Sequence, residues 1–230
     1  MVSAFGVGVE EVEAAMNRHL TEDKYSWAQK RLGIDAARFG DDKWVIFPRQ
    51  GLAAFKPVEM RHVRSQEVAT RVIAAKIKWK SEREYFDDGG GYASGAIDAM
   101  IAAGYTPTPI NFAGKAIDPR FYNKRAEILW NCAQWVKRGG ALPRVPDLVD
   151  EMVKHTYTFK AGKLIIIDKD QVKALLGRSP NYFDALALTH SEPDMPNEVD
   201  ALLNALQRNT RTAAHDFDPF RDTSNVQAAH

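Results

Sequence analysis

The sequence has little of several features that would narrow its function at once. It contains a single cysteine, Cys132, in 230 residues, which excludes a disulfide framework and a cysteine-ligated zinc site. Its 31 basic and 30 acidic residues leave a net charge of +1, so composition neither indicates nor excludes a nucleic-acid partner. No stretch approaches the roughly 20 apolar residues that span a bilayer, and the N-terminus lacks a signal-peptide pattern. We therefore expect a soluble, intracellular protein with no membrane partner.

A phosphate-binding loop for nucleotide hydrolysis is also missing. The pattern Gly-x-x-x-x-Gly-Lys-Ser/Thr occurs nowhere, and Gly114-Lys115 lacks both the preceding glycine and the following hydroxyl residue. We therefore expect no ATPase activity from this chain.

What is present suits one globular domain. Hydrophobic residues make up 45% of the chain, enough for a sizeable core. Apolar residues at helical spacing predict a short helix over 9–20, inside an N-terminal linker, 1–30. The polar residues 208–230 offer few apolar anchors and predict a mobile tail. The domain itself is expected over residues 31–207.

Within this domain the pattern predicts a meander followed by alternating elements. Three antiparallel strands are expected at 31–35, 43–47 (closed by Pro48) and 52–63, then a helix capped by Ser65. A strand at 84–88, a helix at 94–103 and an extended segment at 105–112 follow, and then mainly helices, at 121–137, 168–176, 181–189 and 197–206. Residues 145–158 could form a helix ending in a strand, facing a strand at 164–167. The order predicts an α/β mixed sheet flanked by helices and resembles that of ribonuclease H-like domains.

Three aspartates stand where such a sheet could bring them together. Asp35 ends the first strand, Asp88 ends the fourth with Asp87 beside it, and Asp184 lies one turn inside a late helix. Each alone could be an ordinary turn, cap or surface residue. A cluster of three carboxylates is costly unless cations neutralise it, and Mg²⁺ or Mn²⁺ suits such hard oxygen ligands. Two ions about 4 Å apart could hydrolyse a phosphodiester and leave a 3′-hydroxyl and a 5′-phosphate.

The segments around these aspartates resemble the nuclease motifs of bacteriophage terminase large subunits. Residues 32–42 (LGIDAARFGDD) are similar to the first motif and 87–100 (DDGGGYASGAIDAM) to the second. Residues 177–189 (GRSPNYFDALALT) are similar to the third, the most specific, because its Ser-Pro turn and Asp-Ala-Leu-Ala-Leu-Thr helix are intact. Departures at Asn181, at Tyr182-Phe183 and at His190 remove no ligand.

The resemblance implies a ribonuclease H-like endonuclease that cuts concatemeric double-stranded DNA during viral genome packaging. It implies Asp35, Asp88 and Asp184 as catalytic, metal-binding residues for two Mg²⁺ or Mn²⁺ ions; aligning the glycines favours Asp88, with Asp87 as the alternate. It also implies a terminase small subunit and a portal as partners, in the cytoplasm of an infected bacterial host. Because terminase large subunits place an ATPase before the nuclease, we expect this chain to be an excised C-terminal domain.

Basic residues near the motifs are candidates to contact the DNA backbone. The alternative is that they are ordinary solvated surface residues. They are Arg38, Lys43, Lys115, Arg120, Lys124 and Arg125. Phosphate contacts of this kind would position DNA without reading its sequence. Asp42 is a candidate to support the metal site without binding an ion, the alternative being a turn-forming role.

Three other functions remain open from the sequence. A Holliday-junction resolvase or transposase-like nuclease would keep the fold, although the third motif and the lack of a fourth acid argue against it. An actin-like nucleotide-binding module would want Gly, Ser or Thr after the first acid, where this chain has Ala36. A non-enzymatic DNA-binding or portal-docking module, inactive without an ATPase half, would not need the intact acid set.

Overall fold

The computed structural model describes residues 7–36 and 43–213. Its centre is a six-stranded mixed sheet with the order β3-β2-β1-β5-β6, in which β4 also pairs with β2. Strand β1 runs antiparallel to β2 and parallel to β5, and β5 runs parallel to β6. The strands are β1 (Lys30–Asp35), β2 (Trp44–Gln50), β3 (Ala53–Ala54), β4 (Val58–Met60), β5 (Arg83–Asp87) and β6 (Thr108–Ile110).

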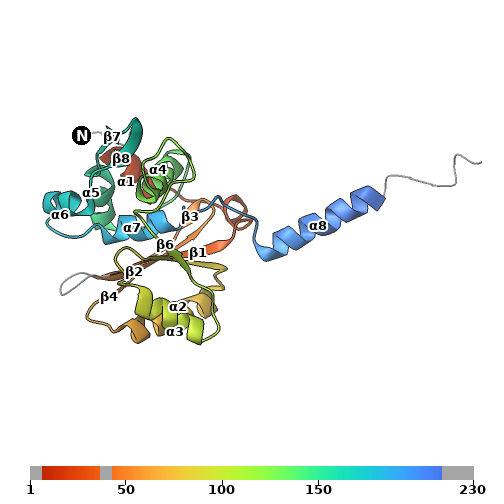
Figure 1. Cartoon of the computed structure of the whole chain (residues 1–230). Helices are drawn as coiled ribbons and strands as arrows, with labels where there is room; N and C mark the ends of the chain where they lie inside the picture. Colours follow the sequence, from red (N-terminus) through yellow and green to blue (C-terminus); the bar gives the residue numbers. More distant parts are fainter. Residues whose placement is uncertain (1–6, 37–42, 214–230) are drawn as a thin grey trace, which may run out of the picture.

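Helices cover both faces of this sheet (Figure 1). The helices α2 (Ser65–Trp79) and α3 (Ser94–Ala102) pack on one face, against a core that includes Leu32 and Ile34. On the opposite face α7 (Asn181–Leu188) packs on the sheet. The helices α4 (Lys124–Lys137) and α5 (Pro146–Val153) pack on α7, and α1 (Val9–Met16) packs on α4 and α5, around a second and larger core. The sheet therefore lies between helices on both sides, and the charged side chains of β1 lie on its α7 side.

The alternation of side chains along β1 assigns each residue to one of these faces. Leu32 and Ile34 point toward α2 and α3. Gly33 lies against the backbone of Ala185 in α7, and the odd-numbered Arg31 and Asp35 share that face with it. One strand thus supplies apolar residues to one layer and polar residues to the other.

The remaining elements extend the α7 side and the C-terminus. A two-stranded antiparallel sheet, β7 (Tyr157–Lys160) and β8 (Lys163–Ile166), precedes α6 (Lys169–Leu176). Helix α8 (Glu198–Ala213) projects away from the body (Figure 1), and a 3-10 turn, η1 (Glu22–Lys24), lies between α1 and β1. None of the helices in the described ranges has the length and hydropathy that crossing a bilayer requires.

Most predicted elements are confirmed, and the differences have local causes. Pro48 does not close the second strand but lies inside β2, where its carbonyl accepts a hydrogen bond from the Phe55 N–H. Ser65 is the first residue of α2 and not its cap. The predicted strand at 52–63 is divided into β3 and β4, and the undecided segment 145–158 forms α5 and the start of β7. Helix α8 continues to Ala213, past the predicted end at Leu206.

Candidate metal centre

Three aspartates from separate elements meet around one lysine. Asp35 ends β1, Asp87 ends β5, and Asp184 lies in α7. The Lys169 Nζ, at the start of α6, lies 2.9 Å from Asp184 Oδ2, 3.2 Å from Asp35 Oδ1 and 3.9 Å from Asp87 Oδ2. Residues that are far apart in the sequence therefore form one charged cluster.

The close approach of α7 to the sheet makes this cluster possible. A Cβ at Gly33 would lie 1.9 Å from the Ala185 carbonyl oxygen, so only glycine fits there. Every residue of α7 is buried, including Asp184. The helix therefore brings Asp184 directly over the strand that ends in Asp35.

The alternation of side chains along β5 decides whether Asp87 or Asp88 faces the cluster. Tyr85 packs in the core on the α7 side and Phe86 in the core on the α2 side. Asp87 therefore shares the side of Tyr85, as its ion pair with Lys169 confirms. The sequence favoured Asp88, which is half-buried and follows the strand, and we now take Asp87 as the third acid of the cluster.

Burial and mutual repulsion shift the protonation equilibria of the cluster. Burial, opposed by Lys169 and assisted by Asp184, raises the pKa of Asp35 well above its ordinary value. Burial likewise raises the pKa of Asp87. Burial also acts to raise the pKa of Asp184, but the charges of Lys169 and Arg125 outweigh it and the pKa lies below the ordinary value. The three carboxylates keep Lys169 charged by raising its pKa, despite burial.

The donor set fits a divalent cation. Asp35 Oδ2 and Asp184 Oδ1 are buried and accept no hydrogen bond, so these oxygens have capacity for another positive group. Carboxylate oxygens are the ligands that Mg²⁺ and Mn²⁺ prefer. Within the described ranges no three His, Cys, Asp or Glu side chains are already gathered in metal-site geometry. The Lys169 ammonium lies among the carboxylates. An ion would bind by competing with this ammonium.

The cluster opens into a cleft of about 360 Å³. Asp87 and Lys169 line one part of it, and the turn at Gly89-Gly90 lies beside them. Tyr92, Asn111, Asn123 and Arg125 line the rest with β8. Of the three acids only Asp87 lines the cleft, whereas Asp35 and Asp184 are fully buried.

Three of the predicted DNA-binding residues are engaged inside the protein. Lys43 is buried and donates to Tyr182 Oη at 2.6 Å and to Glu59. Lys124 donates to Glu127 and to the Ser191 carbonyl. Arg125 donates to the Ile167 carbonyl and lies 3.9 Å from Asp184 Oδ1. These contacts hold all three side chains within the protein, and Arg125 also lines the cleft, so contact with DNA stays a prediction for each of them.

The other predicted contacts are either exposed or not described. Lys115 is exposed on the loop after β6, and Arg120 is exposed and forms an ion pair with Asp118. Arg38 and Asp42 lie outside the described residues. Lys115 and Arg120 stay candidates for contact with DNA.

Sequence reasoning missed Lys169 and a buried polar group behind Asp184. Glu151 Oε2 accepts the Phe183 N–H at 2.8 Å, and Glu151 Oε1 accepts from Arg178. The His155 Nε2 accepts from Arg125, and its Nδ1–H donates to the Glu151 carbonyl, which fits a neutral ring with its pKa lowered to about 4 by burial. Neither Lys169 nor Glu151 left a local signal in the sequence, because each acts through contacts with distant elements.

Comparison with known proteins places the fold. No protein-family profile matches the chain, and no curated protein matches it either. The nuclease domain of the large terminase subunit gp2 of bacterial virus Sf6 is similar, at 20% identity and a TM-score of 0.66, over 81% of this chain and 98% of that one. A mutant of that domain with manganese and beta-thujaplicinol gives 20% identity and a TM-score of 0.67 over the same shares. The large terminase nuclease of the thermophilic phage G20c with bound cobalt gives 19% identity and a TM-score of 0.52, over 84% of this chain and 98% of that one.

These likenesses confirm the predicted fold class, a ribonuclease H-like mixed sheet flanked by helices. They also confirm the predicted resemblance at the level of structure. The chain has the fold of the nuclease domains of phage large terminase subunits.

Proposed function

We propose that this chain is a divalent-metal-dependent endonuclease that cuts concatemeric double-stranded DNA during viral genome packaging. The observation that supports it best is the meeting of Asp35, Asp87 and Asp184 beside an open cleft, with buried oxygens that accept no hydrogen bond. The fold is that of phage terminase nucleases, some of which have been studied with manganese or cobalt. The small terminase subunit and the portal would be further partners, in the cytoplasm of the infected host.

The chain's own residues have distinct tasks in this proposal. Asp35, Asp87 and Asp184 would hold two Mg²⁺ or Mn²⁺ ions, which supply an activated water and stabilise the leaving oxygen. Lys169 compensates the negative charge of the three carboxylates when no ion is bound. The Arg125 guanidinium, 3.9 Å from Asp184 Oδ1, adds positive charge beside that carboxylate. The expected products have a 3′-hydroxyl and a 5′-phosphate.

Cleavage of supercoiled plasmid by the purified chain, with Mg²⁺, Mn²⁺ or EDTA, tests this function. Asp35→Asn and Asp184→Asn should each abolish the metal-dependent cutting. Cutting that survives both substitutions would refute the proposed site. Metal binding without cutting by the wild-type chain would mean that cleavage depends on an ATPase half or another partner.

Substitutions at the neighbouring residues Asp87 and Asp88 test which of the two is the third metal ligand. Asp87→Asn should abolish cutting, whereas Asp88→Asn should reduce it far less, because only Asp87 contacts Lys169 in the cluster. If Asp88→Asn abolishes cutting and Asp87→Asn does not, Asp88 is the third metal ligand.

A further inference from the structure

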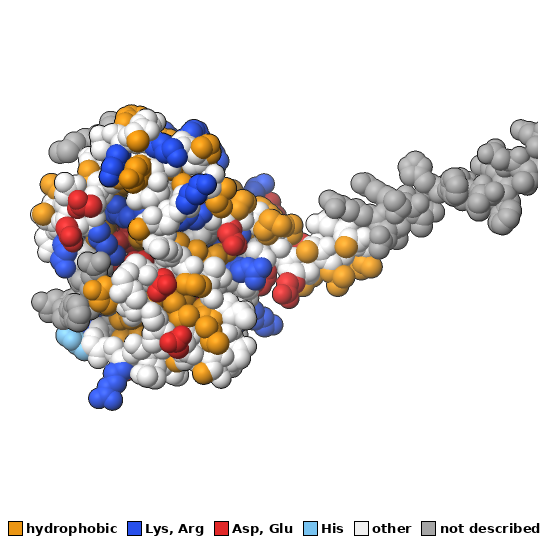
Figure 2. Space-filling model, in the orientation of Figure 1, with side chains coloured by type: hydrophobic (Ala, Val, Ile, Leu, Met, Phe, Trp, Pro, Cys, Tyr) orange, Lys and Arg blue, Asp and Glu red, His pale blue; other side chains and the backbone are white. Residues whose placement is uncertain are grey.

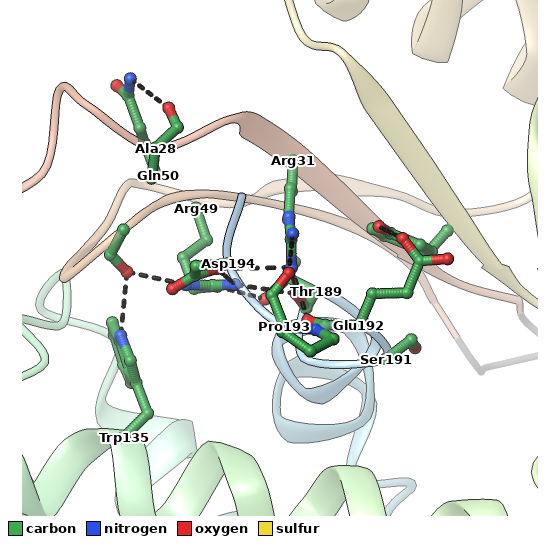
Figure 3. Close-up of polar contacts among 12 residues, drawn as sticks. Ala28, Arg31, Arg49, Gln50, Trp135, Thr189, Ser191, Glu192, Pro193 and Asp194 are labelled. Atoms are coloured by element: carbon green, nitrogen blue, oxygen red, sulfur yellow. Dashed lines mark hydrogen bonds and ion pairs between the residues drawn. The ribbon is translucent and has the colours of Figure 1, made fainter. Parts of the chain in front are cut away.

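The two ends of α7 are held by different charged groups. Near its N-terminal end Asp184 contacts Lys169, as described above. At its C-terminal end the Thr189 carbonyl accepts from Arg31 Nη1 at 3.1 Å and from Arg49 Nη2 at 2.8 Å (Figure 3). Arg49 Nε also donates to Thr189 Oγ1 at 2.8 Å. The last carbonyls of a helix lack partners within the helix and attract cations, so both guanidinium groups lie at a favourable place.

Burying two arginine side chains next to each other costs free energy unless close partners compensate both charges. Arg31 and Arg49 lie directly opposite each other in the β1–β2 ladder, and each side chain is only 1% exposed. Like charges across a strand pair repel, and buried charges need close partners. Asp194 supplies one partner, at 2.6 Å from Arg49 Nη2 and 3.3 Å from Arg31 Nη1.

The segment after α7 completes the cage around the two side chains. Arg31 donates to the carbonyls of Glu192 and Pro193 (Figure 3). Arg49 donates to the carbonyl of Gly51. Apart from the Asp194 carboxylate and the Thr189 hydroxyl, these acceptors are backbone oxygens whose positions depend on the chain path. The arginines therefore fix where the chain leaves α7.

Strand β1 connects this cage to the acid cluster. Arg31, Gly33 and Asp35 share one face of the strand, and four residues of a strand span roughly 13 Å. Asp184 and Thr189 are five residues apart in α7 and its C-cap, roughly 7.5 Å along the helix axis, so the helix connects the arginines with the acids. A buried helix of this length moves as a unit, and a shift at Thr189 is transmitted to Asp184.

We propose that Arg31 and Arg49 are positioning residues that hold the C-terminal end of α7 and thereby set the place of Asp184 beside Asp35. This inference rests on the proposed function, because it takes Asp184 and Asp35 as metal ligands. A lysine cannot replace either arginine fully, since one ammonium cannot reach the separate acceptors that the planar guanidinium reaches.

The test uses Arg31→Lys and Arg49→Lys in the full chain, under conditions where circular dichroism shows the protein folded. Isothermal titration with Mn²⁺ should give a dissociation constant raised about tenfold, the lower end for loss of a group that orients a ligand. Without metal, amide hydrogen exchange should become faster in α7, and the exchange of the strands of the sheet should increase less. The control is Lys76→Met, which breaks the Lys76–Glu84 ion pair, 2.9 Å long, on the other face of the sheet. It should lower stability but leave the Mn²⁺ affinity unchanged.

The outcomes separate the inference from the proposed function. An unchanged Mn²⁺ affinity in folded arginine variants, with exchange either unchanged or uniformly faster, would overturn the positioning role. If the wild-type chain binds no Mn²⁺, the proposed function fails, and the exchange of α7 alone then decides the positioning role. Faster exchange confined to α7 would still support it, and any other pattern would refute it.

Discussion

At the scale of single residues, Lys169 stands where it affects both stability and metal binding. Its ammonium is the shared counter-charge of Asp35, Asp87 and Asp184. We expect Lys169→Met to destabilise the metal-free protein by about 3 kcal/mol, since removing one partner of a buried charge pair leaves the other uncompensated. We also expect Mn²⁺ to raise the melting temperature of this variant more than that of wild type, because the ion no longer competes with an ammonium.

Thermal unfolding with and without Mn²⁺ measures both effects. Lys163→Met, at an exposed position of β8, is the matched control and should change neither value. An unaltered metal-free melting temperature in Lys169→Met would show that the ammonium does not stabilise the cluster.

Glu151 should make stability depend on pH. Burial raises its pKa to about 7, against the hydrogen bond from Phe183 and the ion pair with Arg178. The folded protein therefore binds this proton more tightly than the unfolded chain, and the unfolding free energy falls as pH rises from about 4.5 to about 7. Each pKa unit corresponds to about 1.4 kcal/mol, which gives a loss of a few kcal/mol at most.

Glu151→Gln keeps an oxygen for the Phe183 N–H and removes the titration. Urea unfolding at pH 5 and pH 8 should show that wild type loses more stability between these values than the variant does. An equal loss in both proteins would mean that Glu151 titrates in the folded and unfolded states alike.

The sequence revealed the acids more easily than their surroundings. Asp35 and Asp184 were found because each stands in a recognisable motif beside a strand or helix signal. The choice between Asp87 and Asp88 needed the register of β5, which a pattern of five residues does not fix. Lys169 and Glu151 act through contacts between distant elements, and local spacing gives no sign of such contacts.

At the scale of elements, the contact between β1 and α7 should tolerate no side chain at Gly33. A Cβ there would also lie 3.1 Å from Thr189 Cγ2, besides its overlap with the Ala185 carbonyl. We expect Gly33→Ala to destabilise the fold by about 3 kcal/mol, as overpacking against backbone does, and to weaken Mn²⁺ binding by displacing Asp184.

Urea unfolding and Mn²⁺ titration measure the two effects of Gly33→Ala. Gly162→Ala, in the β7–β8 turn, is the control, because its added Cβ meets nothing within 4 Å and only its φ of 74° is unfavourable. That control should cost about 1 kcal/mol and spare the metal affinity. A Gly33→Ala chain as stable as wild type would mean that α7 can move away from the sheet without loss.

Element types were predictable and element ends were less so. The periodicities that separate helices from strands lie within each segment, so the order of the elements followed from the sequence. Pro48 was expected to end a strand because it lacks an N–H, yet β2 tolerates it where its carbonyl alone is needed, by Phe55. Likewise, the start of α2 depends on Arg64 in an extended conformation and not on the serine that follows.

At the scale of the whole molecule, α8 stands apart from the body. It projects from the domain, and Figure 2 shows hydrophobic side chains along its exposed surface. Val199, Leu202 and Leu203 are 67%, 61% and 49% exposed, although their spacing is that of a helix with an apolar face. The apolar periodicity therefore predicted the helix correctly but gave no sign that the helix leaves the core.

The stable unit should consequently end before α8. The chain is tied to the body up to Asn197, whose side chain donates to the Ser26 carbonyl at 2.6 Å and whose N–H donates to Trp27. We expect removal of residues 198–230 to change the melting temperature by no more than about 2 °C, because little apolar surface is lost from the core.

A truncation only slightly longer should behave differently. Removal of residues 194–230 deletes Asp194, whose carboxylate lies between the buried Arg31 and Arg49, and leaves two like charges facing each other without it. We expect this chain to lose several kcal/mol, as other uncompensated buried charges do, and to show it in the same melting experiment. If both truncations cost equally much, α8 packs on the domain in solution. If neither costs anything, Asp194 is dispensable, and the backbone carbonyls and the Thr189 hydroxyl suffice as acceptors for the two arginines.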